Sequence, residues 1–318
     1  MKRHRASAHG FASLLLVFLW FSVTVHGQVC SDCEIPASQR ADRISAADQA
    51  LTLADSDAES VRARHLPFGL PVAGSNTSNE RLLLQFEWVA WYDDDLRMPL
   101  WVAYELTRED AAAESERQDC FRSDPRLSEL AAAKCEDYEE PVFDRGHMIP
   151  RNDLNRSRTA HDNSFLFSNM APQFPNFNRR VWRRLESKVH DWAIDAGGIY
   201  VITGAIFDRD GDGKRDADSA AEVVSPRNRV GIPTAFYKIV LHRRPNGVID
   251  TIAFILQHNN SSSTNRNSYL VSKIASIDEI ESVTGIDFFP DMDPGLEGQV
   301  EAGKGQSLGR WFTSQIPE

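Results

Sequence analysis

The stretch Asp144-Arg145-Gly146-His147 decides how this chain should be interpreted, together with the segment from Asn178 to Glu186 that follows it within about forty residues. A histidine beside an arginine, followed by an asparagine and a glutamate on a predicted helix, supplies a base, an anion-binding fork and oxygen ligands. Metal-assisted cleavage of a phosphodiester requires these groups. The pattern therefore points to phosphodiester chemistry.

His147 is the predicted general base. A lone histidine is more often structural, but this one follows an arginine at a point where a strand should end in a loop. A neutral imidazole can accept a proton from water near physiological pH. Arg145 lies two residues earlier, so in an extended segment both side chains project toward the same side. Its guanidinium can then clamp a phosphate oxygen.

Asn178 is the predicted metal ligand, because an amide oxygen suits Mg²⁺, which keeps several waters and needs few protein ligands. Glu186 lies eight residues further on, about 12 Å along a helix axis. The two side chains can hardly share an inner coordination shell. We therefore assign Glu186 to hydrogen-bonding the waters of the metal. A helix salt bridge from Glu186 to Arg183 or Lys188 is the alternative.

The order and spacing of these residues resemble the DNA/RNA non-specific endonucleases, the ββα-metal family, and the resemblance extends from about residue 86 to residue 289. It implies an α+β fold with a mainly antiparallel central sheet, a catalytic metal-binding helix and a loop-rich periphery. It also implies a Mg²⁺-dependent, sequence-nonspecific endonuclease that cuts DNA and RNA to 5′-phosphate ends, with Mn²⁺ able to replace Mg²⁺.

The resemblance carries over residue by residue. His147 matches the general base of the family, and Arg145 matches the arginine of its motif. Asn178 matches the single direct metal ligand, and Glu186 matches the glutamate eight residues later. Asn169, in the run Leu-Phe-Ser-Asn-Met-Ala-Pro-Gln, matches an asparagine near the scissile phosphate.

A basic strip surrounds these residues, although the chain as a whole carries a net charge of −11. Only two acids, Asp153 and Asp162, lie between residues 145 and 184. Phosphate contacts supply sequence-independent affinity, so the strip suits binding of DNA and RNA through the backbone; a solvated helix face is the alternative. The eight arginines of the strip are Arg145, Arg151, Arg156, Arg158, Arg179, Arg180, Arg183 and Arg184.

Four arginines are the predicted substrate contacts. Arg145, Arg179 and Arg183 come from the strip. The family has a further phosphate-binding arginine upstream of the motif, and here Arg122 and Arg117 both lie nearby. Arg122 is taken as the predicted contact, with Arg117 as the other candidate.

The first 27 residues predict an export signal. Three cations within the first five residues precede an apolar run at 11–25, and small or tolerated residues at 25–27 favour cleavage after Gly27. An uncleaved anchor is the alternative, although the run is short for a bilayer span. We therefore expect a secreted protein, periplasmic or extracellular, that does not contact the membrane once the signal is removed.

Four cysteines follow the predicted signal. An even number in an exported chain favours disulfides. The preferred pair is Cys120–Cys135, because it closes a short loop inside the domain. Cys30 and Cys33 then form a local disulfide or a clip from the N-terminal segment onto the domain.

The rest of the chain divides into three predicted parts: an N-terminal arm of unknown role at 28–80, the endonuclease domain at 81–290, and a polar, loosely ordered tail at 291–318. Weak helical patterning covers 46–64, and 107–139 is predicted to be loop. Within the domain, apolar periodicity and turn residues predict a hairpin, three further strands and two helices. These are the hairpin 86–92 and 100–106, the helix 178–196, the strands 199–207, 231–242 and 248–257, and a last helix 274–283.

A second metal signal lies in the segment 208–219. Aspartates stand at positions 1, 3, 5 and 9 of an EF-hand-type calcium loop with glycine at position 6. Position 12 is Ser219, so the bidentate glutamate is missing unless Asp218 or Glu222 replaces it. Structural Ca²⁺ and an unliganded acidic turn both remain open. The four aspartates are Asp208, Asp210, Asp212 and Asp216.

Two other functions compete with the nuclease. One is a catalytically silent secreted protein that binds nucleic acid or calcium. Its weakness is that binding alone needs none of His147, Asn178 and Glu186 at their spacing. The other keeps the chemistry but narrows the substrate to single strands or nucleotides.

Overall fold

The computed structural model describes residues 28–74, 79–139, 142–224, 229–261, 267–304 and 311–312. The predicted export signal lies outside these ranges. Within them, the model contains no helix with the length and apolar character needed to cross a membrane.

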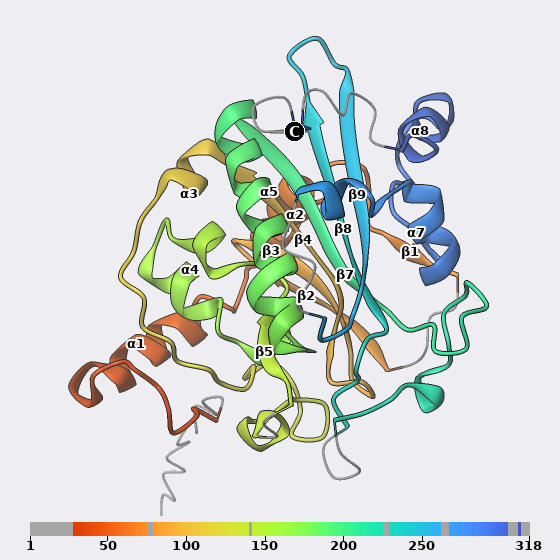
Figure 1. The fold of residues 1–318 in the computed structure, drawn as a ribbon. Coiled ribbons are helices and arrows are strands. Elements are labelled where there is room, and N and C mark those ends of the chain that lie inside the picture. Colours follow the sequence, from red (N-terminus) through yellow and green to blue (C-terminus); the bar gives the residue numbers. More distant parts are fainter. Residues whose placement is uncertain are drawn as a thin grey trace, which may run out of the picture.

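A seven-stranded antiparallel sheet with the order β10-β9-β8-β7-β4-β3-β2 forms the centre of the molecule (Figure 1). Between the adjacent strands β4 and β7 the chain leaves the sheet, and this excursion carries the residues of the predicted nuclease site. The strands are β2 (Glu80–Gln85), β3 (Trp88–Asp93), β4 (Met98–Thr107), β7 (Gly198–Ile206), β8 (Ala235–Arg243), β9 (Ile249–Gln257) and β10 (Ile274–Ala275).

The excursion contains a strand–strand–helix unit. β5 (Asp144–His147) pairs with β6 (Met170–Gln173), and a π-helical turn, η4 (Phe177–Trp182), then leads into α5 (Arg183–Ala196). The buried residues of α5 recur at helical spacing, and they pack the helix against β4 and β7. Gly197 ends the helix in the left-handed conformation, with φ of 87°. The α+β class and the ββα unit are as predicted.

Gly146 is required by close packing inside this unit. A Cβ at this position would lie 2.3 Å from Cδ of Gln173, a fully buried side chain on β6. Any larger residue would push the two strands apart. The glycine of the motif therefore serves the fold that presents its neighbours Arg145 and His147.

The other elements surround the sheet. α2 packs against β2, β3 and β4, and α1 packs against α4. β1 pairs with β11. The bounds are α1 (Ala37–Gln49), α2 (Asp55–His65), β1 (Val72–Ala73), α3 (Arg108–Ala112), η1 (Cys135–Tyr138), η2 (Arg151–Leu154), α4 (Arg158–Asn163), η3 (Phe167–Asn169), η5 (Asp218–Ala220), α6 (Asn267–Val271), α7 (Ile277–Thr284), β11 (Ile286–Asp287) and α8 (Pro294–Glu301).

The disulfides are Cys30–Cys135 and Cys33–Cys120, so the preferred pair Cys120–Cys135 was wrong and the clip onto the domain is correct. The N-terminal segment runs beside residues 119–123, with the amide of Cys30 donating to the carbonyl of Phe121 (3.0 Å). This pairing of distant segments brings each N-terminal cysteine beside its partner in the domain. The prediction failed because it relied on nearness in sequence.

Several element boundaries differ from the prediction for local reasons. The last helix starts at Ile277, because Ser276 caps it with a reciprocal bond to Glu279 and residues 274–275 pair with β9 instead. The patterning at 46–64 is divided between α1 and α2. The predicted loose tail contains α8, and beyond it Trp311 packs on Trp192 of α5 with ring centroids 5.0 Å apart.

Candidate active site

A cavity of about 640 Å³ opens where β5, η4 and α5 meet the loop at 117–121. Arg145, His147, Asn178 and Glu186 all line it. The ββα unit brings these residues together from β5, η4 and α5. Four of the predicted site residues therefore share one space.

His147 stands at the end of β5 in a largely aromatic environment. Its ring centroid lies 5.9 Å from that of Phe121 and 5.4 Å from that of Phe165. Burial lowers the pKa of His147 to about 3, although the nearby Asp119 opposes this shift. Among the described residues, its buried Nε2 has no hydrogen-bond partner. The imidazole is therefore neutral at physiological pH, the form that accepts a proton.

Asp144, the first residue of the motif, orients the predicted metal ligand. Asn178 donates from Nδ2 to Asp144 Oδ2 (2.9 Å), which leaves the amide oxygen as the acceptor. Asp144 also accepts two bonds from Arg179, at 2.8 and 2.6 Å. Sequence analysis gave Asp144 no role, although its place in the motif was the available signal. It positions both Asn178 and Arg179.

The segment before η4 is held by His258, the residue that follows β9. Phe174, just before η4, donates its amide to Nε2 of His258 (2.8 Å), while Nδ1 of His258 donates to the carbonyl of Pro233 (2.8 Å). Burial lowers the pKa of His258 to about 4, which keeps the ring neutral, with one nitrogen donating and the other accepting. No motif in the sequence links His258 to the site. π-helical turns such as η4 are often found at functional sites.

Glu186 reaches the cavity from α5. Burial raises the pKa of its carboxyl group, while the charge of Lys238 opposes the shift and Asp153 reinforces it. Lys238 is fully buried on β8, with its Nζ over the ring of Trp182 at 4.8 Å. A buried cation thus lies behind Glu186 and favours its charged form.

The N-terminal segment supplies a carboxylate to the motif arginine. Arg145 donates from Nη1 to Asp32 (2.7 Å), and its guanidinium also lies 4.6 Å from the ring centroid of Phe121. Asp32 lies between Cys30 and Cys33, so the two disulfides hold it beside the cavity. Nothing in the motifs predicted this contact.

Asn169 does not reach the cavity, so its predicted contact with the scissile phosphate is corrected. The side chain is fully buried. Its amide accepts from the backbone of Ile149 (2.9 Å) and donates to the carbonyls of Ile149 (3.1 Å) and Ser164 (2.9 Å). Asn169 therefore fixes the loop that follows His147.

Arg122 is also corrected as a substrate contact. It is fully buried and donates to Asp48 (3.1 Å), to the carbonyl of Asp162 (2.6 Å) and to Asn163 (2.6 Å). These bonds tie α1 to α4. Arg117, the other candidate, has a side chain 61% exposed and lines the cavity.

Most arginines of the basic strip lie around two neighbouring hollows. Arg179 and Arg183 line both the cavity and a neighbouring depression of about 350 Å³, which Arg180 and Arg184 also line. This pair of hollows forms one basic surface along α5. Arg151 lines the cavity but not this depression.

Two arginines of the strip bind elsewhere. Arg156 lies 3.6 Å from Asp110, and Arg158 donates to the carbonyl of Glu116 (3.3 Å). Neither lines the cavity or the depression. They stabilise the surrounding loops.

In the predicted calcium loop, Asp208, Asp210 and Asp212 place carboxylate oxygens within 4.8 Å of one another. Oδ1 of Asp208 is buried and has no partner in the described part of the chain. Asp216 instead accepts from the amide of Arg209 (2.7 Å). The structure thus gathers three of the four predicted ligands, and the calcium site stays a prediction.

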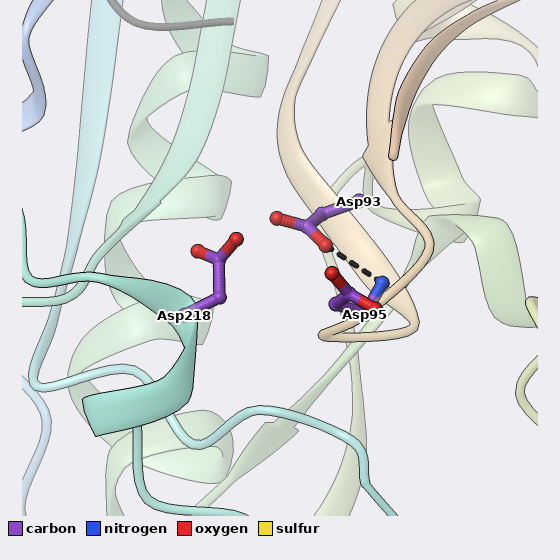
Figure 2. A group of neighbouring side chains, drawn as sticks. All are labelled: Asp93, Asp95 and Asp218. Carbon is purple, nitrogen blue, oxygen red and sulfur yellow. Dashed lines mark hydrogen bonds between the residues drawn. The ribbon is translucent and has the colours of Figure 1, made fainter. Parts of the chain in front are cut away.

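A second acidic group lies where this loop packs on the turn between β3 and β4. Figure 2 shows Asp218 facing Asp93, with Asp93 accepting from the amide of Asp95 (2.8 Å). Arg215 donates to both Asp218 (2.6 Å) and Asp93 (3.3 Å). A guanidinium therefore already balances this group.

Comparisons with known proteins agree with this geometry. The model of the family "DNA/RNA non-specific endonuclease" matches residues 70–294, which include every residue of the strand–strand–helix unit. Mitochondrial endonuclease G of Homo sapiens is 28% identical over 229 residues, which cover 71% of this chain and 73% of the relative. Mitochondrial nuclease EXOG of Danio rerio is 28% identical over 228 residues, or 70% and 63% of the two chains. Venom phosphodiesterase 2 of Crotalus adamanteus is 26% identical over 264 residues, which cover 76% of this chain but 32% of that protein.

Proposed function

Because this chain belongs to the family of DNA/RNA non-specific endonucleases, we propose that it is a secreted, Mg²⁺-dependent endonuclease that cuts DNA and RNA without sequence preference. The observation that carries the proposal is the convergence of His147, Asn178 and Glu186 on one cavity beside Arg145. Mn²⁺, with similar oxygen preferences, should replace Mg²⁺.

The donor set of the cavity fits Mg²⁺. Asp144 takes the amino group of Asn178, so the amide oxygen can bind the ion. Glu186 would hydrogen-bond waters of the ion rather than bind it directly. When bound, the metal stabilises negative charge that develops on the phosphate and on the leaving oxygen.

His147 acts as the general base. It accepts a proton from a water whose oxygen attacks phosphorus, and the bond from phosphorus to the 3′ oxygen breaks. The leaving 3′ oxygen takes up a proton from solvent, and His147 later returns its proton to solvent, so the products are a 5′-phosphate and a 3′-hydroxyl. The low pKa of His147 keeps the base form available across the physiological range.

The arginines hold the substrate by its backbone. Arg145 binds the reacting phosphate in place of Asp32, because a phosphate and a carboxylate compete for the same fork. Arg117, Arg179 and Arg183 contact neighbouring phosphates along the basic surface. No base-reading element is needed for such binding.

Secretion is supported by the two disulfides, since such bonds persist in oxidising compartments. In this proposal residues 1–27 are an export signal and 28–80 an arm that the disulfides hold beside the active site. The predicted domain limits at 81 and 290 belong to the same proposal.

A plasmid assay tests the function against a silent binding protein. The purified chain is incubated with supercoiled DNA and with RNA in Mg²⁺, in Mn²⁺ and in EDTA. With either metal we expect nicking followed by degradation, and in EDTA we expect neither. The product ends should carry a 5′-phosphate that a phosphatase removes. Binding without cleavage in both metals would overturn the proposal, and 5′-hydroxyl ends would overturn its mechanism.

A further inference from the structure

Five carboxylates converge where α7, α8 and β11 meet. Asp278 and Glu281 stand three residues apart on α7, Glu297 and Glu301 stand four apart on α8, and Asp287 ends β11. Residues at these helical spacings share one face, so each helix presents two acids. In Figure 1 the two helices lie one above the other beside the sheet.

The carboxylate oxygens meet in two overlapping groups. Oxygens of Asp278, Glu281 and Glu301 lie within 4.8 Å of one another, and so do those of Asp287, Glu297 and Glu301. Two ligands on one Ca²⁺, each at about 2.3–2.6 Å, are separated by at most about 5 Å. Both groups therefore have the span of a coordination shell, and Glu301 belongs to both.

Glu301 is the decisive residue. Its side chain is only 7% exposed, and its Oε1 is buried with no hydrogen-bond partner in the described residues. A buried carboxylate oxygen without a partner is costly, because it has lost water and gained nothing in return. The Glu301 side chain lies among further carboxylates, and Glu281 can hydrogen-bond it only when a proton lies between the two, because ionised carboxylates cannot donate.

Basic side chains of the described residues do not neutralise these carboxylates. Across the described ranges, no ion pair links a lysine, arginine or histidine to any of the five acids. The nearest in sequence, Lys304, pairs with Glu279, which is outside both groups. The acidic group of Asp93, Asp95 and Asp218 differs, because Arg215 pairs with two of its members.

We propose that the acidic site, made of Asp278, Glu281, Asp287, Glu297 and Glu301, binds a divalent cation, and that this cation is Ca²⁺. Ca²⁺ takes six to eight oxygens in flexible geometry, whereas Mg²⁺ demands a near-octahedral shell and keeps several waters. Five carboxylates on three elements suit the larger ion. The site is separate from the nuclease centre and does not depend on the proposed activity.

The bound ion joins α8 to α7. The chain beyond α8 brings Trp311 and Phe312 against Trp192 of the catalytic helix α5. The ion would therefore stabilise the C-terminal segment on the protein. Its loss should appear first as a change in stability.

Calorimetry of the full chain and of Glu301→Gln, each in EDTA and in Ca²⁺, tests the proposal. In EDTA, Glu301→Gln should melt higher than wild type, because one of five mutually repelling charges is gone. In Ca²⁺ the order should reverse, because the variant has lost the ligand shared by both groups. A purely structural role for Glu301 would shift the melting temperature in the same direction in both conditions.

Equilibrium dialysis with radioactive Ca²⁺ at fixed excess Mg²⁺ gives the stoichiometry. Glu301→Gln should lose one bound ion per chain. Glu279→Gln is the matched control, because it removes a neighbouring carboxylate on α7 that lies outside both groups, and it should keep the ion. Glu297→Gln, on the more exposed side, serves as a second ligand variant should Glu301→Gln misfold.

Two outcomes would overturn the proposal. One is an unchanged Ca²⁺ stoichiometry in both ligand variants. The other is a wild type that binds no Ca²⁺ and gains no stability from it, with Glu301→Gln more stable in every buffer. That result would mean that Glu281 and Glu301 share a proton instead of an ion.

Discussion

The cavity beside His147 and the acidic site between α7 and α8 both gather oxygen ligands, yet they are built in opposite ways. The cavity offers Asn178 and Glu186 and surrounds them with arginines. The acidic site offers five carboxylates and, in the described part of the chain, no basic partner. A metal in the cavity needs water and phosphate to complete its shell, whereas the acidic site can hold an ion with protein alone. The charge around the ligands thus distinguishes the two proposed sites: the cavity leaves room for substrate phosphate, whereas the acidic site suits a structural ion.

Removing the base should have the largest effect. His147→Ala should lower the turnover number by about 10²–10⁴-fold, the usual contribution of a general base. DNA affinity should stay near the wild-type value, because the variant keeps every arginine of the cavity. Single-turnover cleavage and fluorescence anisotropy measure the two quantities. Near-normal cleavage by this variant would remove His147 from the mechanism.

Removing the metal ligand should be nearly as damaging and should also change the metal requirement. Asn178→Ala should raise the Mg²⁺ concentration for half-maximal rate by at least about tenfold, as loss of metal-site partners usually does. Asn176→Ala is the matched control, since its amide bonds Asn260 outside the cavity. The cleavage rate of wild type and both variants is measured across a Mg²⁺ titration. Equal curves for wild type and Asn178→Ala would show that the ligand lies elsewhere.

The basic surface should show its role in the salt dependence of binding. Arg183→Ala should reduce the log–log slope of affinity against salt by about one unit, for one lost phosphate contact. Arg158→Ala, from the same strip but bonded to the carbonyl of Glu116, should leave the slope unchanged. Equal slopes for the two variants would mean that Arg183 faces only solvent.

The residues predictable from sequence are those that the ββα unit itself presents. Periodicity placed His147 and Arg145 on one side of a short strand, and the order and spacing of the motifs grouped them with Asn178 and Glu186. The strands β3, β4, β7, β8 and β9 and the helix α5 were predictable because their apolar patterns are long and regular, whereas β2 and β10 were not predicted.

What escaped prediction depends on contacts between distant segments. Asp32 reaches Arg145 only because the disulfides pair each arm cysteine with a domain cysteine. His258, which follows β9, holds the segment before Asn178 although it lies 84 residues beyond Phe174 in the chain. Asn169 and Arg122 have the residue types of a phosphate site, yet Asn169 bonds backbone groups, and Arg122 bonds a backbone carbonyl, Asp48 and Asn163. Residue type and spacing do not reveal which polar groups the fold has already used.

The stability contributed by His258, which holds the segment before η4, and that contributed by the acidic site should depend on pH in opposite directions. Burial lowers the pKa of His258 to about 4, so below the unfolded value of about 6.5 the unfolded chain binds more protons and stability falls as the pH drops. Burial raises the pKa values of Glu281 and Glu301, so in EDTA stability falls as the pH rises above about 4.5. Urea unfolding in EDTA should therefore show a maximum between these limits.

A different variant tests each side of this pH profile. His258→Gln should flatten the acid limb, because the amide can replace both hydrogen bonds of the neutral ring without titrating. Glu301→Gln should flatten the alkaline limb. A profile that either variant leaves unchanged would show that the group in question does not titrate as described.

The smallest expected effect belongs to the loop at 208–216. Asp208, Asp210 and Asp212 come together there, but Asp216 bonds the amide of Arg209 and no glutamate stands at position 12, so any Ca²⁺ should bind weakly. Stabilisation by a ligand follows its concentration relative to the dissociation constant, about 1.4 kcal/mol at ten times that constant. The combined change Asp210→Asn and Asp212→Asn should therefore remove only a minor, high-concentration part of the Ca²⁺ shift in melting temperature, and it should spare cleavage. The larger part should remain and should disappear with Glu301→Gln. If instead the loop variant abolishes the whole shift while Glu301→Gln keeps it, the structural ion lies in the loop, and five unbalanced carboxylates are not enough to hold one.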